Sequence, residues 1–142
     1  RRHAAGALRN LAAAPRRNKF HLVKHGNGSL LGALTDAARN DPDMAVRTRV
    51  LATLHNLTCA DSAEILMSEP GLLDLLADFA TAEKFDDGEE DELTTLAYRT
   101  LRTIEKAVSS DMSCHDDLHK VLHRVAATRN SNAQNATESP SD

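Results

Sequence analysis

The sequence has few aromatic residues: Phe, Tyr and Trp make up 3% of its 142 residues, and Trp is absent. A core must therefore come mainly from Leu, Ala and Val side chains. Cysteine is also scarce, with only Cys59 and Cys114, far apart in the chain. Two such residues suit free thiols in a reducing compartment better than a disulfide framework. We therefore expect an intracellular protein, either cytoplasmic or nuclear.

Long apolar runs and catalytic motifs are missing as well. No stretch approaches the roughly 20 apolar residues that a transmembrane helix needs. No nucleophile elbow, phosphate-binding loop or catalytic carboxylate pair is visible in the sequence. We therefore predict that the chain is not an enzyme, needs no cofactor and does not enter a membrane.

One short phrase, in contrast, occurs three times. It reads Ala7-Leu8-Arg9-Asn10-Leu11, then Thr53-Leu54-His55-Asn56-Leu57, then Thr100-Leu101-Arg102-Thr103-Ile104, at spacings of 46 and 47 residues. A fixed period of this size is typical of stacked helical units, none of which can bury its apolar face alone. Such stacks mostly form binding surfaces.

Each phrase predicts a helix with two different faces. At 100° per residue, one face is apolar; its members are Ala4, Ala5, Leu8 and Leu11, then Val50, Leu51, Leu54 and Leu57, then Ala97, Tyr98, Leu101 and Ile104. The opposite face is small, amide or basic. Its predicted members are Arg2, Gly6 and Asn10 in the first copy, Arg49 and Asn56 in the second, and Arg99 and Thr103 in the third.

Further helices follow each phrase. The first two copies predict the same order of elements after the phrase: a short helix, a Gly-containing break and a second, apolar helix. Asp43 is expected to cap the second long helix, Asp61 is expected to cap the short helix of the second copy, and the third long helix is expected over about Asp91–Val108. No segment alternates at period two, so no strand is predicted.

This order of three helices resembles the armadillo repeat. The resemblance rests on residues 4–12 and the Asn18…Leu22-Val23…Gly28-x-Leu30 run, with a weaker echo from Leu54 to Leu73. It implies an all-α, right-handed solenoid of about two and a half repeats over residues 1–128. Residues 129–142 are polar and have no periodicity, so a disordered tail is predicted there. The chain is then expected to be a C-terminal fragment of a longer armadillo protein. HEAT repeats, which lack this Gly and Asn signature, rank second.

The resemblance also implies a role for Asn10 and Asn56. In armadillo proteins the matching Asn pairs with the backbone of an extended peptide, because an amide offers both donors and an acceptor. The simpler interpretation is that each Asn ties one helix to the next. One departure matters: the importin-alpha type has Trp four residues before the Asn, whereas this chain has Gly6, Ala52 and Arg99. Binding of nuclear-localisation peptides is therefore not expected.

Charge is distributed unevenly along the chain. Residues 1–50 carry ten Lys/Arg and three Asp/Glu, and residues 51–142 carry seven and eighteen. Nucleic-acid binding would need a sustained basic face with stacking aromatics, which the sequence does not provide. We expect a protein or peptide partner of acidic or mixed charge. The acidic run Asp86–Glu92 could attract a cation or a basic partner, or could simply be a solvated insertion.

A histidine series near the C-terminus is the only metal-like pattern. His115, His119 and His123 recur every four residues after Cys114, so neighbours could chelate Zn, Ni or Cu. The favoured interpretation is a polar capping helix with no functional metal. The predicted function is thus a protein-interaction scaffold that binds a peptide or protein in a groove. The alternative is a substrate-recruiting segment of a larger enzyme such as a ubiquitin ligase.

Overall fold

A computed structural model of the chain describes residues 1–82, 91–108 and 113–137. Within these ranges the chain is helical and contains no strand, which confirms the all-α prediction. The elements are α1 (Arg2–Ala12), α2 (Arg16–Lys24), the short 3-10 helix η1 (His25–Gly28), α3 (Ser29–Asn40), α4 (Met44–Leu57), α5 (Ala63–Ser68), α6 (Leu72–Ala80), α7 (Glu92–Ala107) and α8 (His115–Thr137).

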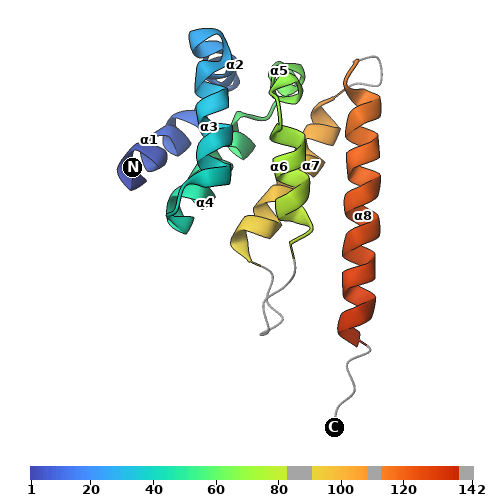
Figure 1. The fold of residues 1–142 in the computed structure, drawn as a ribbon. Coiled ribbons are helices and arrows are strands. Elements are labelled where there is room, and N and C mark those ends of the chain that lie inside the picture. Colours follow the sequence, from blue (N-terminus) through green and yellow to red (C-terminus); the bar gives the residue numbers. More distant parts are fainter. Residues whose placement is uncertain (83–90, 109–112, 138–142) are drawn as a thin grey trace.

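The long helices form two rows. Helices α1, α4 and α7, which carry the three copies of the repeated phrase, pack side by side in one row. Helices α3, α6 and α8 stand next to one another in the second row, with α8 at the far end from α1 (Figure 1). The short helices α2 and α5 lie at the same end of the molecule (Figure 1). None of the described helices has the length and apolar composition of a membrane span.

The core lies between the two rows. The apolar stripe predicted for the second copy is buried completely, with Leu54 and Leu57 each 1% exposed. The third copy buries Ala97, Leu101 and Ile104 and half-buries Tyr98. The first copy differs: Ala5 is buried, but Ala4 is exposed and Leu11 is 55% exposed. Helix α1 packs mainly against α4 and also touches α2, and these contacts leave Ala4 and Leu11 uncovered.

Two glycines set the start of the second-row helices. Gly28 precedes α3 with a φ of 87°, and Gly71 precedes α6 with a φ of 76°. Such left-handed backbone is cheap for Gly and strained for other residues. The predicted order of short helix, Gly and apolar helix is therefore confirmed in both copies.

The two predicted caps have different outcomes. Asp43 is the N-cap of α4, and its carboxylate accepts a hydrogen bond from the backbone N–H of Ala45 at 3.0 Å. Asp61 does not cap α5, which begins at Ala63 with Ser62 as its N-cap. Instead, Asp61 pairs with Arg16 of α2 at 2.8 Å. The Ser62 hydroxyl donates to the carbonyl of Leu57 at 2.6 Å.

The C-terminal helix is longer than the sequence predicts. Helix α7 matches its predicted bounds closely, but α8 continues to Thr137 and so includes residues 129–137 of the expected disordered tail. Arg129 explains part of the extension: its guanidinium lies 4.4 Å from the Tyr98 ring centre and donates to the Ala80 carbonyl at 3.0 Å. These contacts hold the helix against the body of the molecule beyond residue 128. Residues 138–142 of that predicted tail lie outside the described part of the chain.

Candidate functional site

Two side-chain hydrogen bonds align α1 with α4. Arg49 donates from Nη1 to the backbone carbonyl of Arg2 at 3.2 Å, and Asn56 donates from Nδ2 to the carbonyl of Arg9 at 3.4 Å. Each bond joins residues that are 47 positions apart, one more than the 46-residue spacing between the first two copies of the phrase. Since the early residues and the late residues of both helices pair in order, α1 and α4 run in the same direction.

An open hollow lies on the surface of this helix pair. It measures about 670 Å³, and we call it the α1 hollow. Most of its lining comes from α1, and Arg49 of α4 closes one side. The lining residues are Arg2, His3, Gly6, Ala7, Arg9, Asn10 and Arg49. The side chain of Asn10 is exposed here, so its amide is free to meet a ligand.

A second hollow, the α4 hollow, continues the first toward α7. It measures about 360 Å³ and is lined by Arg9, Met44, Ala45, Thr48, Arg49, Ala52, Asp91 and Glu92. Arg9 and Arg49 line both hollows. The two hollows are therefore neighbours that share these two side chains. They lie along α1, α4 and the start of α7, and together we call them the groove.

The structure brings together four of the seven predicted site residues: Arg2, Gly6, Asn10 and Arg49 line the α1 hollow. Asn56 lies at its border, half-buried and bonded to the Arg9 carbonyl. This bond fits the simpler interpretation, in which the Asn56 amide ties two helices together. It uses only one of the two N–H donors of the amide and leaves the amide oxygen available.

The third copy does not extend the groove. Arg99 is exposed but lines neither hollow. Thr103 turns its hydroxyl back to its own helix and donates to the Arg99 carbonyl at 2.8 Å. Thr is too short to reach the neighbouring helix as Asn56 does, so the tie between α1 and α4 has no counterpart at this position.

Sequence reasoning missed Arg9, which lines both hollows. A signal for it was present: Arg2 and Arg9 are seven residues apart, a spacing that places two side chains on nearly the same side of a helix. Met44, half-exposed in the α4 hollow, was also missed. Asp91 and Glu92 were predicted as the start of a helix and the end of an acidic run, but not as site residues. Residues 86–90 of that run lie outside the described chain.

The contact between α4 and α7 contains a titratable group. His55 is half-buried, and its Nδ1 lies 3.2 Å from the hydroxyl of Thr100. Burial lowers the pKa of the His55 imidazole below its ordinary value of 6.5, and the nearby charges of Arg99 and Lys19 lower it further. Neutral imidazole is therefore the favoured form in the folded chain.

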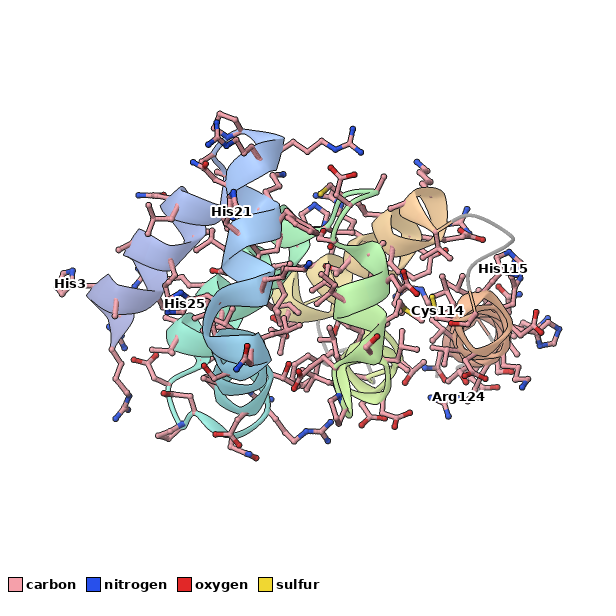
Figure 2. The ribbon with its side chains drawn as sticks, turned by 90° about the horizontal axis from the view of Figure 1, so that it is seen from above. His3, His21, His25, Cys114, His115 and Arg124 are labelled. Atoms are coloured by element: carbon pink, nitrogen blue, oxygen red, sulfur yellow. The ribbon has the colours of Figure 1, made fainter. Side chains whose placement is uncertain are left out.

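The histidine series lies far from the groove. Figure 2 shows His115 at the α8 end of the molecule and His3 at the opposite, α1 end. The rings of His115 and His119 are 4.4 Å apart, centre to centre, and His123 is exposed one turn further along α8. Among the described residues, no three His, Cys, Asp or Glu side chains are grouped so that they could hold a metal ion.

Helix α2 carries a separate surface hollow, lined by Arg16, Arg17, Phe20, His21 and Asp61. Its charges are partly satisfied, since Arg16 pairs with Asp61. Lys24 lies 4.4 Å from the centre of the Phe20 ring, as a cation–π contact. Unlike the groove, this hollow combines no residues from the repeated phrases.

Comparison of the chain with models of protein families, with curated proteins and with solved structures finds no match in any of the three. What the chain can bind must therefore be inferred from its own surface. On that surface the groove is the depression formed jointly by the repeated helices, with amide, basic and acidic side chains along it.

Proposed function

We propose that the chain is an intracellular interaction module: an armadillo-like right-handed helical solenoid that binds an extended segment of another protein in the groove and carries out no catalysis itself. The observation that carries this proposal is that Arg9 and Arg49 line both hollows and so make them neighbours. A depression that crosses several parallel helices suits an extended peptide laid across them.

The amides supply the chemistry for such binding. A peptide in extended conformation presents an N–H and a C=O at each residue, and these need partners when the peptide is removed from water. Asn10 offers an exposed amide inside the α1 hollow, and Asn56 retains one N–H and its oxygen at the border. Pairing with the peptide backbone gives affinity that depends little on the peptide's sequence.

The packing supports a rigid platform beneath these amides. Leu51 and Leu54 of α4 are 0% and 1% exposed, so the helix that carries Arg49 and Asn56 is fixed by core contacts. A groove that exists before the ligand arrives needs little ordering on binding, which reduces the entropic cost of association.

Selection of peptides from a random phage-displayed library tests the proposal. The peptides are about 12 residues long, so that an extended chain, at roughly 3.3 Å per residue, can span the groove. Asn10→Ala should weaken a selected peptide by about 1–3 kcal/mol, the usual cost of leaving polar groups unpaired. Asn18→Ala is the matched control, because Asn18 is exposed on α2 and lines neither hollow of the groove. Equal losses in the two variants, or no loss in Asn10→Ala, would show that the groove is not the binding site.

A further inference from the structure

Two cations of the groove have no carboxylate partner within the described residues. The exposed side chain of Arg9 forms no hydrogen bond or ion pair with a described residue, and Arg49 donates only to the carbonyl of Arg2. The other arginines near this end are paired: Arg1 with Asp41 at 3.0 Å, and Arg2 with Asp43. The two cations at the junction of the hollows are therefore available to a ligand.

Two carboxylates at the α7 side of the groove are also available. Asp91 is half-buried and is the N-cap of α7, but its side chain makes no capping hydrogen bond. Glu92 is exposed in the first turn of the same helix. Neither forms an ion pair with another described residue, and both line the α4 hollow together with Arg9 and Arg49. The groove thus has a basic part and an acidic part.

From this arrangement we infer that the groove selects a charge-paired peptide: an acidic side chain sits at Arg9 and Arg49, and a basic side chain sits at Asp91 and Glu92. The inference rests on the proposed function and adds the partner's chemistry. Arginine pairs well with carboxylates because its planar guanidinium can donate two parallel hydrogen bonds.

The spacing of the two charges follows from geometry. Helix α4, which carries Arg49, packs directly against α7. Packed helices lie about 8–10 Å apart, and an extended chain advances about 3.3 Å per residue. Side chains on the same side of an extended peptide are two or four residues apart. The acidic and basic residues of the partner should therefore be separated by about two to four positions.

The same arrangement discriminates against partners of a single charge. A peptide with only acidic residues meets Asp91 and Glu92, and one with only basic residues meets Arg9 and Arg49, so either is repelled at one part of the groove. Charge complementarity of this kind acts mainly on specificity and on the rate of association. Phosphate backbones are disfavoured for the same reason, because their charge is negative throughout.

The test compares peptides selected by the wild-type chain with those selected by Arg9→Glu and by Glu92→Lys, using the same displayed library. We expect wild-type peptides to carry Asp or Glu and, about two to four positions away, Lys or Arg. Arg9→Glu should lose the acidic preference, and Glu92→Lys should lose the basic one. Titrated against a wild-type peptide, Arg9→Glu should bind about tenfold more weakly, and a peptide with Lys in place of the acid should recover part of that loss.

Arg17→Glu is the control for net charge. Arg17 is exposed on α2, outside the groove, and the substitution changes the charge of the chain by the same amount. Helical circular dichroism of each variant checks that it is folded. An unchanged acidic preference in Arg9→Glu, or an equal loss in Arg17→Glu, would overturn the inference.

The outcomes separate the inference from the proposed function. Peptides that require Asn10 but carry no paired charges would overturn only the charge inference and leave the groove as the binding site. Peptides that bind to Asn10→Ala and to Arg9→Glu as tightly as they bind to the wild type would overturn both.

Discussion

Asn56 donates a hydrogen bond of 3.4 Å to the backbone carbonyl of Arg9, a residue 47 positions earlier in the chain. The first two copies of the repeated phrase are therefore joined by a direct contact between side chain and backbone. The bond is long and the side chain is half-buried, so its contribution to stability is expected to be small.

Asn56→Ala and Leu54→Ala should have opposite effects on folding and binding. Removing the Asn56 amide should lower the free energy of unfolding by about 1 kcal/mol or less and weaken peptide binding by about 1–3 kcal/mol. Leu54 is 1% exposed, and Leu54→Ala should lower stability by about 2–5 kcal/mol through a core cavity. Denaturant titrations and peptide binding measure both quantities. If Asn56→Ala unfolded the chain and left affinity intact, the amide would be structural.

The effect of a Gly→Ala substitution on stability should depend on the backbone φ angle of the glycine. Gly28→Ala and Gly71→Ala place a side chain at φ values of 87° and 76°, and each should lower stability by about 1–2 kcal/mol. Gly6 lies inside α1 with nothing within 4 Å of an added Cβ, so Gly6→Ala should raise stability by up to about 1 kcal/mol. Thermal melts of the three variants provide the comparison, and a stabilised Gly28→Ala would contradict the left-handed turn.

Acid should weaken the contact between α4 and α7 through His55. Its pKa is lowered in the folded chain, so below about pH 6.5 the unfolded chain binds a proton that the folded chain does not. This contribution therefore makes stability fall as the pH falls through 6.5 toward the lowered folded value. Urea midpoints at about pH 7.5 and about pH 5.5 measure the change. His55→Gln should show a smaller drop than the wild type, and an identical drop would assign the effect to other groups.

Amide exchange should be faster in α1 than in α4. Helix α1 buries only Ala5 and Ala12 fully, and Leu11 is 55% exposed, whereas α4 buries residues on every turn. Few buried contacts allow local opening at low free energy. Hydrogen exchange followed by NMR should therefore show weaker protection at Leu8 than at Leu54. Equal protection at these two positions would mean that the chain opens as a single unit.

Much of the fold could be predicted from the repeated phrase. The apolar stripes of the second and third copies, the Asp43 cap and the bounds of α7 follow from helical periodicity and capping chemistry, which are local properties. The length of α8 could not be predicted in this way. It depends on Arg129 reaching Tyr98 and Ala80, and contacts between distant residues leave no local pattern.

The site was predicted less completely than the fold. The helical period of 100° per residue placed Arg2, Gly6, Asn10 and Arg49 on the polar faces of their helices. The structure brings these four residues into one hollow. The helical period alone could not show that Asn56 would bond to the Arg9 carbonyl, or that Asp91 and Glu92 would line the same hollow as Arg9. Those relationships depend on how the helices are offset along their axes.

The parallel direction of α1 and α4 has an electrostatic consequence. Each helix carries a partial positive charge at its N-terminus, equivalent to about half an elementary charge, and parallel neighbours place these ends side by side. Asp43 lies at the start of α4, accepts from the N–H of Ala45, and also pairs with Arg2 at the start of α1. One carboxylate thereby offsets the dipole of its own helix and anchors the neighbouring helix. At this edge of the molecule, the negative charge of Asp43 is therefore shared between the N-terminal ends of helices from two successive repeats.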